Sequence, residues 1–182
     1  MPTSGWQKIG HVMQVLNFVI QPASVLDVGI GFGKFGFLFR ETLDIRKRRY
    51  DPSEWQTRID GVESWRNYIT PVQQFIYDNL YIGDIRKLVH QLDAYELIVL
   101  ADVIEHMPFE EGASLLRVLF SQHCTRGMVV SYPNTIGSDW KRWENPYERH
   151  QCIWKQNHIL ELFPDAIVKF STSQVAFILK EN

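Results

Sequence analysis

The chain has 182 residues, of which 45% are hydrophobic and 22% charged, and its formal net charge is -2 at pH 7. This composition is typical of a folded globular protein and excludes a disordered chain, and the small charge gives no overall field that would attract nucleic acid or an acidic membrane. The length suits one compact unit, so we expect a single domain over residues 1–182.

The cysteine usage and the amino-terminal segment indicate where the protein works. Cys124 and Cys152 are far apart and follow no disulfide or zinc spacing, which favours a reducing compartment. Residues 1–22 contain Lys8 and His11 among their apolar residues, so they resemble neither a signal peptide nor a membrane span. We therefore expect a cytoplasmic protein without a membrane partner.

Apolar periodicity predicts helices and strands that alternate along the chain. Helical spacing over residues 5–20 predicts an amphipathic helix that Pro22 ends. The elements then expected are strand 25–28, helix 34–43, strand 58–63, helix 71–79, strand 80–84, helix 85–92, strand 95–102, helix 108–120, strand 127–132, helix 154–163 and the strands 165–170 and 175–180. Thr70 and Gln73 have the spacing of a capping box at the start of helix 71–79.

The alternation indicates right-handed crossovers, and hence a mostly parallel sheet with helices on both faces. Residues 171–174 are too few for a parallel crossover, so the last two strands should be antiparallel. The expected fold is α/β: a doubly wound, mostly parallel seven-stranded sheet with a reversed strand near the C-terminus. Ligands of such sheets bind beyond the carboxyl ends of the strands, near the point where the strand order reverses.

Those strand ends are acidic. Asp27, Glu63, Asp84 and Asp102 stand at the ends of four successive predicted strands, and Glu105 follows shortly after. Any one of them is explained by helix capping or by a loop position. Four in succession indicate a binding site.

Two glycine patterns overlap after the first strand. Gly31, Gly33 and Gly36 satisfy the GxGxxG fingerprint of dinucleotide sites, whereas Asp27 and the glycines at 29, 31 and 33 satisfy DxGxGxG. A pyrophosphate would be repelled by several nearby carboxylates, each pair costing a few kcal/mol at about 4 Å. Glu63 is expected for either ligand, because it can accept both ribose hydroxyls, whereas Asp27, Asp84 and Asp102 favour a ligand that bears positive charge. A nicotinamide dinucleotide is the alternative.

The segments VLDVGIGFG, GVES, IGDI and LADVIEHMP, in this order over residues 25–132, resemble the class I S-adenosylmethionine-dependent methyltransferases. The resemblance implies a Rossmann-like methyltransferase fold and S-adenosylmethionine as the cofactor, whose net charge is positive. It implies cofactor contacts from Asp27, Gly29, Gly31, Gly33, Glu63, Ser64, Asp84, Ile85, Asp102 and Val103.

By the same resemblance, the main chain of the glycines would approach the methionine part of the cofactor, and Asp27 would meet its ammonium group directly or through water. Glu63 would accept the ribose hydroxyls and Asp84 the adenine amino group. Asp102 would line the methionine end.

Two histidines are candidates for a catalytic base on the acceptor side. His106 follows the fourth strand, and His150 lies in a long loop, residues 133–153, that should cover the acceptor. Each also has a structural reading, as a helix cap for His106 and as an anchor of the loop for His150. No metal is expected, because Asp102, Glu105 and His106 lack the carboxylate and amide set of the catechol-type relatives.

We hypothesise a methyltransferase that acts on a small-molecule acceptor. The alternatives are an NAD-dependent oxidoreductase and a non-catalytic module that binds S-adenosylmethionine. The basic and aromatic loop also leaves a nucleic-acid acceptor open, although it is not favoured. Neither the acceptor nor the oligomeric state follows from the sequence.

Overall fold

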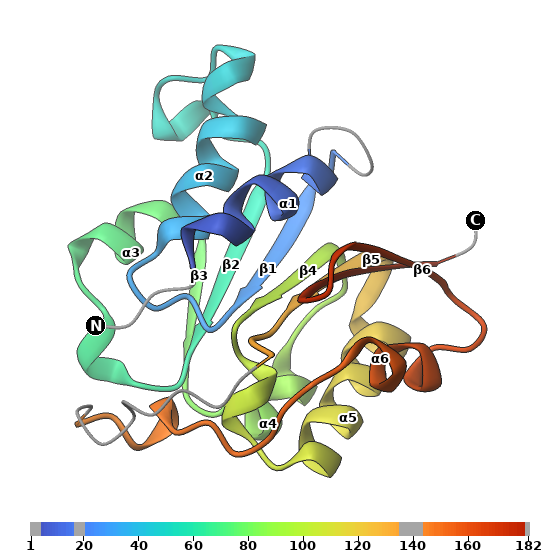
Figure 1. Ribbon diagram of the computed structural model, residues 1–182. Helices are drawn as coiled ribbons and strands as arrows, with labels where there is room; N and C mark the ends of the chain where they lie inside the picture. The colour runs from blue at the N-terminus through green and yellow to red at the C-terminus, as the bar shows by residue number, and fades with distance from the viewer. Residues whose placement is uncertain (1–4, 17–20, 135–143, 181–182) are drawn as a thin grey trace.

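A seven-stranded sheet forms the centre of the molecule in the computed structural model, which describes residues 5–16, 21–134 and 144–180 (Figure 1). The strands have the order β3-β2-β1-β4-β5-β7-β6 across the sheet. Their bounds are β1 Ser24–Val28, β2 Arg58–Glu63, β3 Asn79–Ile82, β4 Tyr95–Ala101, β5 Cys124–Ser131, β6 Ile167–Thr172 and β7 Val175–Leu179. All neighbouring pairs from β3 to β5 are parallel, and β7 is antiparallel to both of its neighbours. The predicted α/β sheet and its reversed strand are confirmed.

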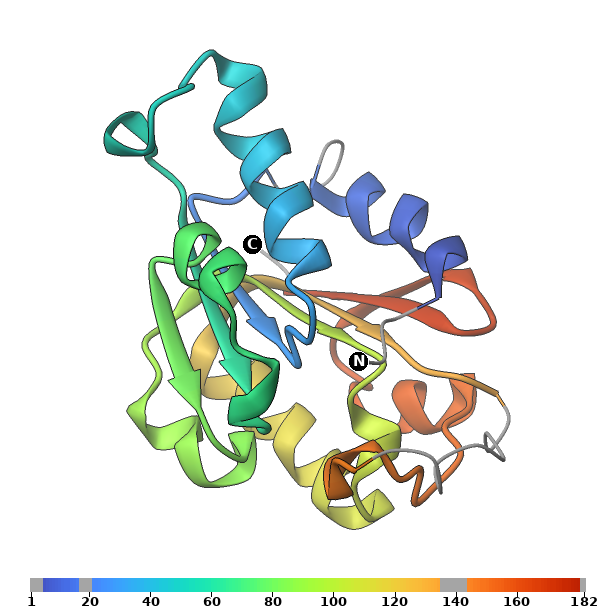
Figure 2. The same cartoon turned by 90° about the vertical axis from the view of Figure 1, so that its left-hand side faces the viewer.

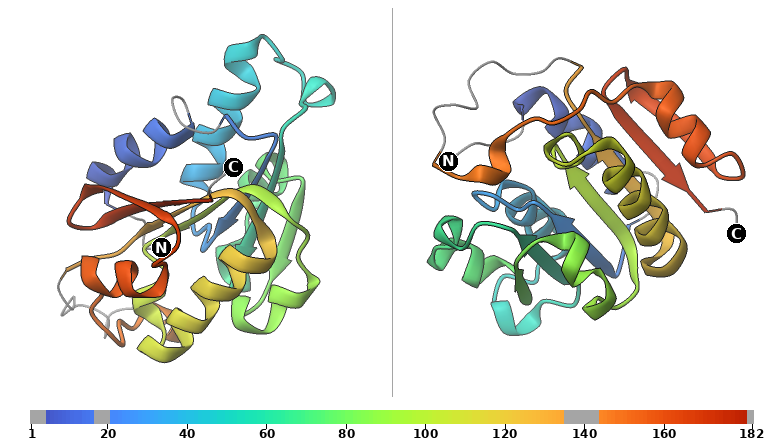
Figure 3. Two further views of the ribbon diagram at one scale, coloured as in Figure 1. Left: turned by 90° about the vertical axis from the view of Figure 1, so that its right-hand side faces the viewer. Right: turned by 90° about the horizontal axis from the view of Figure 1, so that it is seen from below.

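Helices cover both faces of the sheet, as expected for buried parallel strands. Their bounds are α1 Ile9–Gln14, α2 Lys34–Leu43, α3 Pro71–Ile76, α4 Ile85–Leu88, α5 Phe109–Val118 and α6 Gln156–Leu162. The first three cover the upper face in Figure 1 and the last three the lower face. Figure 2 shows α1 beside α2, and the right panel of Figure 3 shows α5 crossing the lower face and α6 at the end formed by β6 and β7.

Two apolar clusters join these layers. Val12, Phe39 and Ile76 from α1, α2 and α3 belong to one cluster with inward residues of the sheet. Ala113 and Ile159 from α5 and α6 belong to the other. Each of these helices therefore contributes one apolar stripe to the core, which is the pattern that its periodicity predicted.

Several element ends differ from the sequence prediction. The helix expected over 71–79 stops at Ile76, because Tyr77 is extended and turns the chain into β3. The helix expected over 85–92 has one α-helical turn and continues as a 3-10 helix, η6 (Val89–Gln91). The last four positions of the helix expected over 5–20 lie outside the described residues.

The capping box of α3 is confirmed. The backbone N–H of Thr70 donates to Oε1 of Gln73 at 2.9 Å, and the N–H of Val72 donates to the Thr70 hydroxyl. No helix among the described residues is long and apolar enough to cross a membrane.

A buried polar pair lies between β1, α2 and α3. The Tyr77 hydroxyl donates to Oδ2 of Asp27 at 2.6 Å and accepts from the Gly36 N–H at 3.2 Å. Gly36 is required for this approach, because a Cβ there would lie 2.3 Å from the tyrosine ring. Burial raises the pKa of Asp27 to about 7, which the hydrogen bond from Tyr77 only partly opposes.

We expect Gly36→Ala to lower the free energy of unfolding by about 1–3 kcal/mol, because the added methyl group must displace the Tyr77 ring. Gly10→Ala in α1 is the matched control, since its Cβ would meet nothing within 4 Å, and it should be neutral or stabilise by up to about 1 kcal/mol. Denaturant unfolding of the two variants measures both values. Equal stabilities would contradict the close packing described for Gly36.

We also expect Asp27→Asn to change how stability depends on pH. The folded protein keeps the Asp27 proton up to about pH 7, whereas the unfolded chain releases it near 3.8, so the wild type loses stability as pH rises between these values. The variant has no such proton. As pH is raised from 3.8 to about 7, the free energy of unfolding of the variant should therefore increase relative to that of the wild type by up to roughly 4 kcal/mol. Denaturant titration at several pH values measures this difference. A constant difference would show that Asp27 titrates normally.

Candidate active site

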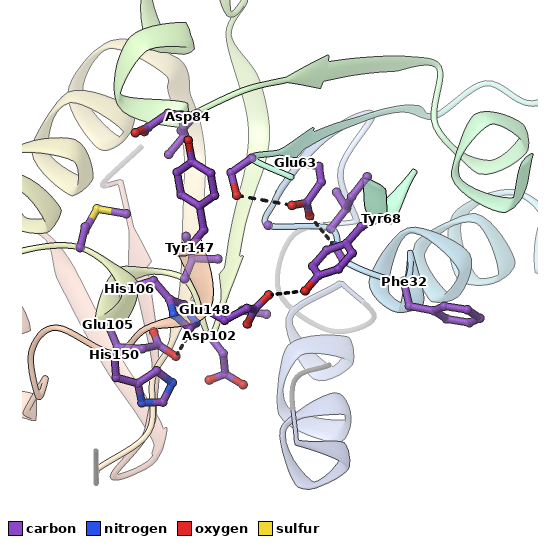
Figure 4. Close-up of a pocket in the computed structure, with 18 of the residues that line it drawn as sticks. Phe32, Glu63, Tyr68, Asp84, Asp102, Glu105, His106, Tyr147, Glu148 and His150 are labelled. Carbon is purple, nitrogen blue, oxygen red and sulfur yellow. Dashed lines mark hydrogen bonds and ion pairs between the residues drawn. The ribbon is translucent and has the colours of Figure 1, made fainter. Parts of the chain in front are cut away.

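A cavity of about 400 Å³ opens at the carboxyl ends of β1, β2 and β4. The strand order reverses between β1 and β4, so the cavity lies where doubly wound sheets bind ligands. Most of the predicted cofactor residues line it: Gly29, Gly31, Glu63, Ser64, Asp84, Ile85, Asp102 and Val103. Both candidate bases, His106 and His150, line it as well (Figure 4). Residues far apart in the sequence are thus brought to one site.

The wall nearest β1 includes exposed main chain at Gly29 and Gly31. Gly29 has φ +77°, and a Cβ there would lie 2.5 Å from the Val103 side chain, so only glycine fits this turn. Gln73, fully buried, donates from Nε2 to the Gly31 carbonyl at 2.7 Å and so fixes the turn from behind. A ligand can therefore approach the backbone closely at this point.

Two predicted cofactor residues do not line the cavity. Asp27 is 1% exposed and faces Tyr77 beneath the floor, where it supports the turn instead of contacting a ligand directly. Gly33 is the N-cap of α2, and a Cβ atom on this residue would point at the Gln73 side chain instead of into the cavity. The DxGxGxG spacing identifies the turn but does not distinguish its cavity side from its buried side.

Glu63 faces the cavity with unused hydrogen-bonding capacity. Its Oε2 accepts from the Gly31 N–H at 2.9 Å, and its Oε1 accepts from the Trp65 N–H at 2.8 Å and from the Ser64 hydroxyl at 3.4 Å. Burial raises its pKa, and these N–H groups oppose the rise. A carboxylate can accept about four hydrogen bonds, so one position is left for a ligand hydroxyl, and a second becomes free when the Ser64 hydroxyl rotates away.

Asp84 and Asp102 each have a cationic partner that the sequence did not reveal. Asp84 caps α4 and pairs with Arg86, whose hydrogen bonds lower the pKa of this carboxyl. Asp102 has φ +59°, a left-handed conformation that Asp tolerates, and pairs with the Lys8 ammonium of η1 (Trp6–Lys8). Three of the four acidic strand ends, Glu63, Asp84 and Asp102, therefore meet at one cavity, and the charges of Asp84 and Asp102 are partly neutralised.

The acceptor end is formed by η7 (Ile104–His106) and the segment after η10 (Pro146–Glu148). The Nε2 atom of His106 lies 3.9 Å from Oε1 of Glu105, and the rings of His106 and His150 are 4.8 Å apart. Burial, together with the neighbouring His150, lowers the pKa of His106 to about 4. Burial, with the charge of Asp102, raises the pKa of Glu105. The imidazole of His106 is therefore neutral at neutral pH.

Tyr68 and Glu148 close the side of the cavity and were not identified from the sequence. The Tyr68 hydroxyl donates to Oε1 of Glu148 at 3.1 Å across 80 residues of sequence (Figure 4). No local spacing signals such a contact. The loop predicted over 133–153 does supply Glu148 and His150, whereas its residues 135–143 lie outside the described part of the chain.

No protein-family model matches the sequence, and no curated protein is significantly similar to it. Solved structures do match the fold. An S-adenosylmethionine-dependent methyltransferase from Archaeoglobus fulgidus is 14% identical with a TM-score of 0.67, and the match covers 94% of this chain and 92% of that one. The magnesium protoporphyrin IX methyltransferase of Synechocystis PCC 6803, solved with bound S-adenosylhomocysteine, is 15% identical with a TM-score of 0.63 and coverage of 96% and 83%.

The methyltransferase domain of the bacterial protein CtHen1 is 16% identical, with a TM-score of 0.64 and 95% of each chain covered. At identities of 14–16%, these similarities show a shared fold and nothing more specific. The chain has the fold of the S-adenosylmethionine-dependent methyltransferases, as the sequence analysis predicted.

Proposed function

We propose that the protein transfers a methyl group from S-adenosylmethionine to a small-molecule acceptor. The observation that carries this proposal is the pairing of Glu63, with free acceptor capacity, and the bare Gly29–Gly31 main chain in one cavity. The volume of about 400 Å³ is in the usual range for small-molecule sites, ~300–1,000 Å³.

The lining residues suit the parts of this cofactor. Glu63 would accept the two ribose hydroxyls, and Asp84 with Ile85 would contact the adenine. The glycine turn and Asp102 would hold the methionine part, with Asp102 shared between the cofactor ammonium and Lys8. Asp27 supports this end from beneath the turn and is proposed to act on the cofactor only through that support.

The chemistry requires alignment more than a reactive side chain. The methyl carbon passes in line from the sulfonium to the acceptor atom, and the C–S bond breaks to leave a neutral thioether. Holding donor and acceptor in this alignment can lower the barrier by about 7–11 kcal/mol. His106 and His150 line the acceptor end, where a neutral imidazole can take the proton that the acceptor releases.

The surroundings of the glycines favour this reading over an NAD-dependent oxidoreductase. Gly33, the second glycine of the GxGxxG pattern, faces Gln73 instead of the cavity, whereas a dinucleotide site needs the main chain open to the pyrophosphate there. A non-catalytic binding module would share the cofactor site and differ only in the absence of turnover.

The domain organisation and the cellular location expected from the sequence form part of the same proposal. We infer one domain whose N-terminal helix and 133–153 loop lie on the cavity side, and a cytoplasmic location. Both cysteines are free, which supports a reducing compartment. A nucleic-acid acceptor is not favoured.

We expect S-adenosylhomocysteine to bind the purified protein in a calorimetric titration, and NAD not to bind. Glu63→Gln should weaken the binding by about 1–3 kcal/mol, because it removes charge-assisted hydrogen bonds to the ribose. Glu161→Ala, which changes an exposed carboxylate on α6, should leave the affinity unchanged and serves as the control.

Absence of S-adenosylhomocysteine binding at millimolar concentration would overturn the proposal. Equal affinities of the Glu63→Gln variant and the wild type would remove Glu63 from the site. Tight binding of NAD instead would favour the oxidoreductase.

A further inference from the structure

Three potential metal ligands converge at the acceptor end of the cavity. Glu105, His106 and His150 each place one ligand atom within 4.8 Å of the others'. Figure 4 shows the carboxylate between the two imidazoles, below the Asp84 and Glu63 end of the cavity. One carboxylate and two imidazoles suit zinc and other first-row divalent metals.

Glu105 gives an independent indication that something is bound here. Its side chain is 1% exposed, yet neither carboxylate oxygen has a hydrogen-bond partner among the described residues. Within the same part of the chain, Nδ1 of His106 is also buried without a partner. A buried carboxylate with no partner costs several kcal/mol, and a directly bound cation would offset that cost.

The frame that holds these ligands is built from main-chain contacts. The Gln151 N–H donates to the Glu105 carbonyl at 2.7 Å, and the Gln151 side chain donates to the His106 carbonyl at 2.7 Å. The indole of Trp154, a fully buried residue, donates to the Ile104 carbonyl at 3.1 Å. His150 is thus fixed beside η7 by its neighbours in the chain, although it lies far from His106 in the sequence.

We propose that Glu105, His106 and His150 bind one divalent transition-metal ion, with the proposed methyl acceptor at a remaining coordination position. Ligand atoms about 2.1 Å from a tetrahedral zinc ion lie about 3.4 Å from one another, so separations of up to 4.8 Å must close by at most about 1.4 Å when the ion binds. Three protein ligands leave a position open, as in catalytic zinc sites.

This inference rests on the proposed function for its substrate class and revises the expectation that no metal is bound. That expectation considered Asp102, Glu105 and His106, whereas Asp102 pairs with Lys8 and the third ligand comes from the distant loop. A metal at this end favours an acceptor hydroxyl. As metal ligands, His106 and His150 would no longer serve as the base described above; coordination would instead ease release of the hydroxyl proton to solvent, and the resulting oxygen anion would take the methyl group while the sulfonium becomes a thioether.

The test uses the full chain without a histidine tag, stripped of metal with a chelator. Zinc is titrated by calorimetry, and cobalt is titrated by visible absorption, which reports the ligand set. We expect one ion per chain. Loss of a residue that only hydrogen-bonds to a metal ligand typically weakens metal binding by roughly 10- to 100-fold. His150→Ala and Glu105→Gln each remove a ligand itself, so we expect a larger loss of zinc affinity in both variants. His90→Ala, which removes a histidine outside the cluster, should leave it unchanged.

A wild type that shows no saturable zinc binding, or cluster variants that both bind zinc as strongly as the wild type, would overturn the inference. So would an equal loss in His90→Ala. Thermal unfolding of each variant establishes that it is folded, and the two cluster variants alter different segments of the chain. S-adenosylhomocysteine titrated into the same samples separates the two proposals: its binding without zinc binding overturns only the metal site, and the reverse overturns only the proposed function.

Discussion

One buried side-chain amide holds together the parts of the structure on which the cavity depends. Nε2 of Gln73 donates to the Gly31 carbonyl at 2.7 Å and to the Tyr68 carbonyl at 2.9 Å, while Oε1 caps the start of α3 through Thr70. The glycine turn, η5 (Arg66–Tyr68) and α3 are therefore fixed relative to one another by a single residue. Because Gly29 and Gly31 have no side chains that could hold the turn in place, its shape is maintained from behind.

The sequence predicted those features that arise from local or periodic constraints. The alternation of strands and helices indicated the parallel sheet, and the short 171–174 connection required the reversed β7. The Thr70 and Gln73 spacing located the start of α3. The position of the cavity followed in turn, since it depends on strand order alone.

Contacts between distant residues could not be predicted in this way. Lys8 reaches Asp102 across 94 residues, and Tyr77 reaches Asp27 across 50. Neither contact leaves a periodic signal, since each depends on how whole helices pack on the sheet. The carboxylate of Asp27 was consequently expected at the ligand, whereas packing against Tyr77 directs it into the core. The proximity of His150 to Glu105 likewise depends on how distant segments pack, so the sequence did not predict it.

The ion pair between Lys8 and Asp102 links the amino-terminal helical turn to the end of β4. Lys8 carries an ammonium group, the same chemical group that the proposed cofactor would present to Asp102. An arriving ligand must therefore compete with, or share, a contact that the chain already makes with itself. Ligand occupancy and the docking of this turn on the sheet are then thermodynamically linked: the free energy by which a bound ligand weakens the docking equals that by which the docking weakens ligand binding.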